Sequence, residues 1–302
     1  MKDIARLAST HHGDPHFPTI LLLPGLGMPA SLWPKAFIEG LVQEGLHVLA
    51  PDNRDSGASE RGKGEVSRSQ VLFSTVRYLM GGKVEAPYRL EDMAWDAEAL
   101  LDALGIDRVH VVGISMGGMV AQVLAARAPH RVSSLTIISS ASGNPRTGLG
   151  KMDAVMSILT PVAVPESIGG SGEKGRFERL VRALAGKSRR FEPGEAEAMA
   201  SLYAEAAPEP EAVGRQLMAI LASGDRRREL AQLAVPTLVV HGTEDPLLPY
   251  KAAEELAGCI QGARLLPIPG MGHEIAPEAV GTIVRAIADM VYSKAPVLRP
   301  GR

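Results

Sequence analysis

Short apolar runs alternate along this chain with longer segments of helical period, and few folds accommodate such an alternation. Six runs rich in Leu, Ile and Val are spaced through it: TILLLPG, HVLAPD, RVHVVG, SLTIISS, PTLVVHG and RLLPIPG. Between them, an apolar stripe from Leu90 to Leu104 predicts a helix, and a second stripe predicts a last helix that starts at about Pro277. Buried strands that alternate with helices indicate an α/β fold with a doubly wound, mostly parallel sheet.

One interval interrupts this alternation. Residues 141–225 contain no convincing strand, but they contain helical stretches such as EKGRFERLVRALAG, GEAEAMASLYAEAA and EAVGRQLMAIL. The strands before and after the interval fit neighbouring positions of one sheet, so we expect an insertion at the carboxyl edge, where open α/β sheets bind ligands. We predict a core of residues 1–140 and 226–302 and an inserted helical cap, or lid, of residues 141–225. Ordinary crossover helices on a sheet face are the alternative.

Charge and cysteine content exclude several classes of protein. The chain has 32 Lys and Arg against 34 Asp and Glu, a net charge of -2, and therefore no global basic field for nucleic acid. Its one cysteine, Cys259, forms no internal disulfide and supplies no cysteine-rich metal site. The start MKDIARLAST lacks the apolar core of a signal peptide, and the longest apolar stretch is too short to span a membrane. We predict a cytoplasmic protein with no nucleic-acid partner and no membrane span, and a homo-oligomer is possible.

The segment HVVGISMGGMVAQVLAARAP carries the most informative motif. Its apolar residues predict a strand up to Val112 and a helix from Met116, with a tight turn between them. A G-x-S-x-G turn in this setting is a nucleophile elbow, which holds Ser115 in a strained conformation with its hydroxyl pushed out of the turn. The glycines on either side remove Cβ atoms that would collide. A glycine-rich helix N-terminus that binds an anion is the alternative.

A serine nucleophile needs a base, and the base needs a carboxylate that fixes its tautomer. After an elbow the expected order along the chain is serine, acid, histidine. The loop after PTLVVHG carries Glu244 and Asp245, and the loop after RLLPIPG carries His273. We predict His273 as the base and Asp245 as the acid, because Asp245 precedes the loop-ordering Pro246 and has the shorter side chain. His241, at the end of a strand, is expected to be structural.

Acyl transfer also needs two backbone N–H groups directed at the developing oxyanion. Met116, the residue after the nucleophile, is expected to supply one, and Leu26 in the glycine-rich loop of TILLLPGLG the other. A simple glycine-rich turn is the alternative for that loop. Two polar clusters are expected to have no catalytic role. They are a surface loop with His11, His12 and His16, and a structural ion-pair and turn cluster of Asp52, Arg54 and Asp55.

Together these segments resemble the α/β-hydrolase superfamily, and more closely its capped branch of proline-iminopeptidase-like enzymes and esterases of the aclacinomycin methylesterase type. The likeness extends from about Thr19 to the final helix and lies in PDNRDSGAS, APYRLEDMAWDAEALLDALGI, HVVGISMGGMVAQ, PTLVVHGTEDPLLP and IPGMGHEI. The resemblance favours Asp245 over Glu244 as the acid. It implies a nucleophile, acid and base at Ser115, Asp245 and His273, and oxyanion donors at Leu26 and Met116.

Two features of the chain depart from that family. The oxyanion loop usually contains His-Gly, and here the pair is Pro24-Gly25, so a side-chain contact that normally orders the loop is absent. The segment before Thr19 is also short, which predicts that an initial hairpin strand is missing.

The leading hypothesis is a serine hydrolase that cleaves carboxylic esters of small to medium apolar substrates through an acyl-enzyme, with no metal or organic cofactor. Apolar residues at the start of the cap are expected to line its pocket or to pack on the core: Met152, Met156, Ile158 and Leu159. One alternative is an aminopeptidase or amidase of the proline-iminopeptidase type, in which cap carboxylates such as Glu195 and Glu205 would hold a substrate ammonium. Another is a non-catalytic small-molecule receptor on the same fold.

Overall fold

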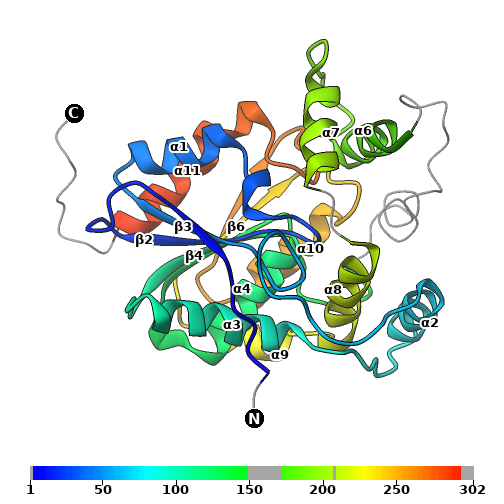
Figure 1. The fold of residues 1–302 in the computed structure, drawn as a ribbon. Coiled ribbons are helices and arrows are strands. Elements are labelled where there is room, and N and C mark those ends of the chain that lie inside the picture. The colour runs from blue at the N-terminus through cyan, green and yellow to red at the C-terminus, as the bar shows by residue number, and fades with distance from the viewer. Residues whose placement is uncertain (1–2, 149–171, 207–208, 294–302) are drawn as a thin grey trace.

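The computed structural model describes residues 3–148, 172–206 and 209–293, which form a seven-stranded sheet with helices on both faces (Figure 1). The strand order is β1-β3-β2-β4-β5-β6-β7, and all neighbours are parallel except β1 and β3. The strands are β1 (Ser9–His12), β2 (Thr19–Leu23), β3 (His47–Pro51), β4 (Val109–Ile114), β5 (Val132–Ile138), β6 (Thr237–Gly242) and β7 (Arg264–Ile268). The predicted α/β fold is confirmed, and each of the six predicted strands is present.

Two apolar layers cover the sheet, because successive side chains of a strand point to opposite faces. Ile20 and Leu22 of β2 belong to a layer with α1 (Lys35–Gln43) and α11 (Pro277–Tyr292). Leu21 and Leu23 belong to the other layer, with α3 (Leu90–Ala103), α4 (Met116–Arg127) and α10 (Tyr250–Cys259). Figure 1 shows α1 and α11 on one side of the strands and α3 and α4 on the other. The predicted helices correspond to α3 and α11.

The edge strand β1 was not predicted from the sequence. Among the described residues no strand precedes it to form an N-terminal hairpin, as expected from the short segment before Thr19. β1 pairs antiparallel with β3, from Ser9 opposite Pro51 to His12 opposite Val48. Its sequence, STHH, has no apolar residue, because an edge strand with exposed or half-buried side chains needs none. His11 and His12 therefore lie in a strand rather than in the expected surface loop.

The described part of the interval 141–225 contains three helices and no strand. These are α6 (Gly172–Leu184), α7 (Glu195–Glu205) and α8 (Pro210–Ser223), and α9 (Arg227–Leu230) then leads back to β6. The flanking strands β5 and β6 are neighbours in the sheet, as expected for an insertion between them. The four apolar residues expected near the start of the cap, Met152, Met156, Ile158 and Leu159, lie outside the described residues.

One further helix, α2 (Arg68–Leu79), is absent from the predicted elements. It lies between β3 and α3 in the chain and packs on α8 through a small apolar cluster that includes Val71, Val84 and Met218. Figure 1 shows α2 at the periphery of the molecule, beyond α8 as seen from the sheet. A helix from the connection between β3 and β4 and one from the connection between β5 and β6 therefore lie against each other.

Candidate active site

The turn between β4 and α4 holds Ser115 in a conformation that L-amino acids rarely adopt, with φ 53° and ψ -119°. The glycines two residues before and two residues after Ser115 are required because a side chain at either position would collide with the backbone. A Cβ on Gly113 would lie 2.3 Å from the carbonyl oxygen of Gly117, and one on Gly117 would lie 2.0 Å from that of Leu23. Ser115 is half-buried while its neighbours on both sides are buried, so the turn presents its side chain at the sheet edge.

Three predicted site residues, which come from three different loops, form a continuous chain of hydrogen bonds. The Nε2 atom of His273, in the loop after β7, lies 2.9 Å from the Oγ atom of Ser115. Its Nδ1 atom lies 2.8 Å from Oδ2 of Asp245, in the loop after β6. A carboxylate only accepts hydrogen bonds, so Nδ1 carries the proton and Nε2 accepts the Ser115 hydroxyl. In this arrangement His273 can take a proton from Ser115.

Asp245 is buried and accepts hydrogen bonds on both oxygens. Oδ1 accepts from the backbone N–H groups of Leu247 and Leu248, each at 2.9 Å. Oδ2 accepts from His273, and the Nε2 atom of the fully buried His241 lies 3.3 Å away from it. Burial raises the pKa of Asp245, but the neighbouring His273 and the hydrogen bonds from both histidines outweigh burial and hold the pKa below its ordinary value. Asp245 is therefore a carboxylate at neutral pH.

His241 lies in direct contact with the acid, which goes beyond the structural role expected for it. Its Nε2 also lies 2.8 Å from the carbonyl oxygen of Leu248, so this nitrogen carries the proton. Its ring packs edge-on against Tyr250, at 6.3 Å between the ring centroids. The sequence signal for this contact is the spacing His241 to Asp245 across the end of β6.

The other carboxylate of this loop, Glu244, has different partners. Its two oxygens accept from the backbone N–H and the hydroxyl of Ser188, at 2.6 Å and 2.7 Å. Ser188 follows α6, so Glu244 connects the inserted helices to the core. Of the two candidate acids, Asp245 alone contacts His273.

The loop after β2 lies beside the serine. A Cβ on Gly25 would come within 3.5 Å of the Cβ of Ser115. The N–H of Leu26, on this loop, and that of Met116, at the start of α4, have no acceptor within the described residues. Both sequence-predicted donors therefore belong to the two backbone segments that meet at Ser115.

Two side chains hold this loop in place, and neither was identified from the sequence. Gln216 of α8 is fully buried; its Oε1 accepts from the N–H of Gly27 at 2.7 Å, and its Nε2 donates to the carbonyl of Arg54 at 2.8 Å. The Nδ2 of Asn53 donates to the carbonyl of Pro24 at 2.9 Å. These contacts order the loop where the family's usual histidine is replaced by Pro24. No local pattern marks Gln216, because it lies far away in the sequence.

The cluster of Asp52, Arg54 and Asp55 makes structural contacts, as its composition predicts, but its ion pairs are with residues elsewhere in the chain. Arg54 pairs with Asp96 of α3, with Nη2 2.6 Å from Oδ1. Asp55 pairs with Arg215 of α8, again at 2.6 Å. Asp52 accepts the backbone N–H groups of two turns, at 2.6 Å and 2.8 Å. The pair to Arg215 adds a second buried link between α8 and the loops near the serine.

A second cluster of charges joins the inserted helices to the His273 loop. Arg189, which is buried, contacts Glu195 of α7, and its Nε lies 3.8 Å from Oε1 of Glu274. Glu274 follows His273 directly, and burial raises its pKa to about 7 although Arg189 acts in the opposite direction. Glu195, a carboxylate considered for an ammonium site, is thus engaged by Arg189.

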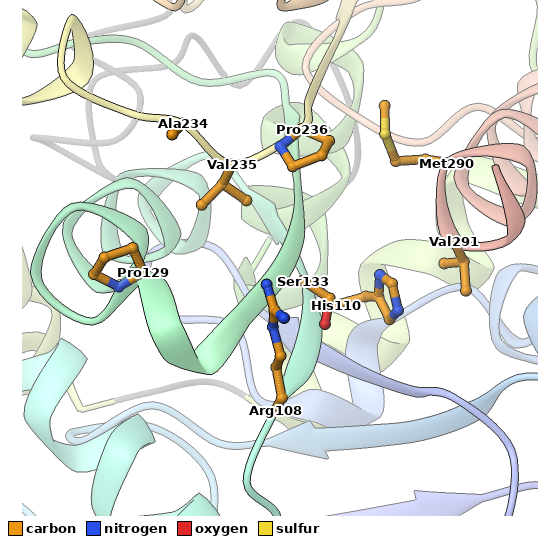
Figure 2. Close-up of a pocket in the computed structure, with 9 residues that line it drawn as sticks. All are labelled: Arg108, His110, Pro129, Ser133, Ala234, Val235, Pro236, Met290 and Val291. Atoms are coloured by element: carbon orange, nitrogen blue, oxygen red, sulfur yellow. The ribbon is translucent and has the colours of Figure 1, made fainter. Parts of the chain in front are cut away.

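A surface pocket of about 500 Å³ lies at the opposite edge of the sheet (Figure 2). Its lining includes Arg108, His110 and Ser133, near the amino ends of β4 and β5, whereas Ser115, Asp245 and His273 follow carboxyl ends. Burial and then Arg108 lower the pKa of His110 to about 4, so this histidine is neutral at neutral pH. The pocket is therefore separate from the candidate active site.

Two absences concern the described residues alone. No group of three or more His, Cys, Asp or Glu side chains in residues 3–148, 172–206 and 209–293 is arranged to hold a metal ion. In the same ranges, every helix is too short or too polar to cross a membrane.

Comparison with known proteins gives both a family and individual relatives. A family model described as the alpha/beta hydrolase fold matches residues 18–280. Rhodomycin D methylesterase DauP of Streptomyces sp. (strain C5) is 30% identical over 300 residues, which cover 91% of each chain. A hydrolase from Pseudomonas aeruginosa PA01 has a TM-score of 0.72 at 24% identity, over 97% of this chain and 96% of its own. A thermophilic esterase from Thermogutta terrifontis has a TM-score of 0.71 at 24% identity, over 96% and 94%.

Proposed function

Because the chain belongs to the α/β hydrolase fold family, we propose that it is a serine hydrolase that cleaves carboxylic esters. The observation that carries the proposal is the chain of hydrogen bonds from Ser115 through His273 to Asp245, at 2.9 Å and 2.8 Å. The likeness to a protein named a methylesterase supports an ester as substrate. The proposed reaction needs no metal or organic cofactor.

In the proposed mechanism, the Oγ of Ser115 attacks the ester carbonyl while the Nε2 of His273 takes its proton. His273 then gives this proton to the leaving alcohol, and an acyl-enzyme stays on Ser115. Water, activated by the same histidine, hydrolyses the acyl-enzyme in the second half of the cycle. Asp245, a carboxylate at neutral pH, keeps the proton of His273 on Nδ1 and stabilises the imidazolium as it forms.

The proposed oxyanion hole consists of the N–H groups of Leu26 and Met116. A pair of pre-organised donors stabilises the charge that develops on the carbonyl oxygen, and each such donor contributes about 10²- to 10³-fold in kcat. Gly25 packs against Ser115, and Gln216 fixes the next glycine, so the loop cannot move away from the serine without breaking a buried hydrogen bond. In this proposal Gln216 orders the oxyanion loop, the role that the histidine of the usual His-Gly pair has in the family.

We also propose that residues 141–225 act as a cap over a core of residues 1–140 and 226–302. The carboxyl end of α6 lies close to the base, because the carbonyl of Leu184 accepts the N–H of His273 at 2.7 Å. α8 reaches the loops after β2 and β3 through Gln216 and Arg215. A cap in these positions would exclude water from the ester and would limit substrates to small or medium apolar molecules.

A panel of p-nitrophenyl esters of increasing acyl length, assayed with the native chain and with Ser115→Ala, tests the proposal. Loss of the nucleophile is expected to lower turnover by about a millionfold, as in a serine protease series. Ser134→Ala, which removes a buried serine hydroxyl from the neighbouring strand β5, is the matched control. Equal rates in the native chain and Ser115→Ala would overturn the proposal. Preference for aminoacyl anilides over esters would replace it with an amidase.

A further inference from the structure

The segment around α2 differs in charge from the rest of the molecule. Residues 61–89 contain six Lys or Arg and two Glu, a net charge of 6 - 2 = +4, in a chain whose net charge is -2. Nothing in the proposed mechanism uses these charges. The six cationic residues are Arg61, Lys63, Arg68, Arg77, Lys83 and Arg89, and the two acidic ones are Glu65 and Glu85.

α2 is a well-formed helix with one side anchored to the body of the protein. A capping box starts it, in which Ser67 and Gln70 satisfy each other's backbone N–H groups. On the inner side, Val71 is buried against the apolar cluster with α8, and the hydroxyl of Tyr78 donates to the carbonyl of Gly143 at 2.5 Å. The contacts of Val71 and Tyr78 fix the rotation of α2 about its axis and so decide which of its residues face outward.

The outer face of α2 is apolar and exposed. Five large apolar side chains there are between 44% and 83% exposed, and Phe73 (75%) and Met80 (83%) are the most exposed of them. We call this set the apolar stripe; it consists of Leu72, Phe73, Val76, Leu79 and Met80. No other segment among the described residues has more than two exposed large apolar side chains. A contiguous exposed set of this kind marks a binding surface rather than ordinary surface composition.

Cationic side chains flank the apolar stripe on both sides. Successive residues of a helix are rotated by about 100° around its axis. With Arg68 set at 0°, the apolar stripe lies between ~20° and ~140° around the axis, and Arg77 lies at ~180°, on the other side of the stripe. Within the described residues neither Arg68 nor Arg77 forms an ion pair, and neither does Lys83 just beyond the helix. α2 itself contains no acidic residue. The helix thus presents an apolar arc between two positive edges that no carboxylate of the described residues neutralises.

We propose that α2 binds the surface of an anionic lipid bilayer, with the apolar stripe inserted among the upper parts of the acyl chains. An apolar arc between basic edges is the arrangement of helices that lie in the membrane interface, where the cations contact lipid phosphates. A second copy of this chain fits less well, because a two-fold contact through the stripe would set the basic edges of the two copies beside each other. The attachment is peripheral and needs no membrane span. It places α8, the neighbour of α2, close to the lipid.

Sedimentation of the full chain with lipid vesicles tests this proposal. Vesicles of phosphatidylcholine alone are compared with vesicles of phosphatidylcholine and phosphatidylglycerol in equal amounts. We expect binding to the anionic vesicles that weakens as salt is raised, because salt screens the contacts of Arg68 and Arg77. Phe73→Ser combined with Met80→Ser is expected to weaken binding by about a hundredfold, at roughly tenfold for each large apolar side chain removed from lipid. The double variant Arg68→Gln, Arg77→Gln is expected to weaken binding to the anionic vesicles but not any residual binding to vesicles of phosphatidylcholine alone.

Leu202→Ser, at an exposed leucine of α7 that is 56% exposed, is the matched control and is expected to bind as the native chain does. Turnover of a water-soluble p-nitrophenyl ester is expected to be the same in all these variants, so failure of the lipid proposal is separable from failure of the proposed hydrolase. Absence of binding of the native chain to anionic vesicles would overturn the proposal. So would a dimer that Phe73→Ser dissociates without any vesicle binding, which would assign the stripe to a second copy.

Discussion

Gln216→Leu is the substitution that most directly tests how the loop beside the serine is held. Leucine has a similar volume, but it cannot accept from the N–H of Gly27 or donate to the carbonyl of Arg54, at 2.7 Å and 2.8 Å in the native chain. Gln216 is fully buried, so each group left without a partner costs about 1–3 kcal/mol, or about 2–6 kcal/mol for both if the backbone does not move. The loop is expected to relieve part of this cost by moving, which displaces the N–H of Leu26.

Displacement of this proposed oxyanion donor is expected to lower kcat by about 10²- to 10³-fold. Ground-state ester binding does not depend on that donor, so KM is expected to change little. The assay is steady-state hydrolysis of a p-nitrophenyl ester, together with inhibition by a trifluoromethyl ketone, whose adduct with Ser115 carries the oxyanion. We expect the affinity for the ketone to fall by about the same factor as kcat, because both depend on the oxyanion contacts.

Gln122→Leu is the control, because Gln122 is also a fully buried glutamine whose side-chain amide both donates and accepts a hydrogen bond. It donates to the carbonyl of Ala141 at 3.2 Å and accepts from Arg226, but it does not contact the loop after β2. Urea unfolding is expected to show similar losses of stability in the two variants, with the large loss of kcat confined to Gln216→Leu. A Gln216→Leu variant that is destabilised but keeps its kcat and its affinity for the ketone would refute the reasoning.

Two predictions concern titration. His241→Phe removes a donor from Asp245, so the carboxylate binds the imidazolium of His273 more strongly, and the acidic limb of kcat/KM is expected to move to higher pH. An unchanged limb with only a lower melting temperature would mean that His241 is structural. The pKa of Glu274 is raised from 4.5 to about 7, so its contribution to stability is fully present below about pH 4.5 and is lost as pH rises through 7. Glu274→Gln is expected to remove this loss, which amounts to about 3 kcal/mol in urea unfolding between pH 4.5 and pH 8; parallel stability curves for the two proteins would contradict it.

The parts of the fold that follow from local pattern were predicted from the sequence. Each buried parallel strand is an apolar run, so all six runs were recognised, and α3 and α11 carry apolar stripes of helical period. The order Ser115, Asp245, His273 was sufficient to nominate the three residues, because each follows the carboxyl end of its own strand and those ends share one edge of the sheet.

The features that were missed depend on contacts between distant segments. β1 is polar, because an edge strand buries little, so its sequence has no strand pattern. α2 has most of its apolar residues on the exposed side, so a reading of its sequence that places apolar residues inward would orient the helix wrongly. The role of Gln216 follows from the packing of α8 onto the core, and nothing in the local sequence distinguishes it from an ordinary surface glutamine of a helix.

The two adjacent side chains of α8 have a consequence for building chimeras of this chain with its relatives. Arg215 and Gln216 attach α8 to the loops after β3 and β2, so by its contacts α8 belongs with the α/β core although it lies at the end of the interval 141–225. α6 and α7 are tied to the core by the segment that joins them, in which Ser188 contacts Glu244 and Arg189 contacts Glu274. An exchange of specificity between relatives should therefore transfer α6 and α7 and keep the recipient's own α8, because a foreign α8 would need its own matching Asp55 and Gly27.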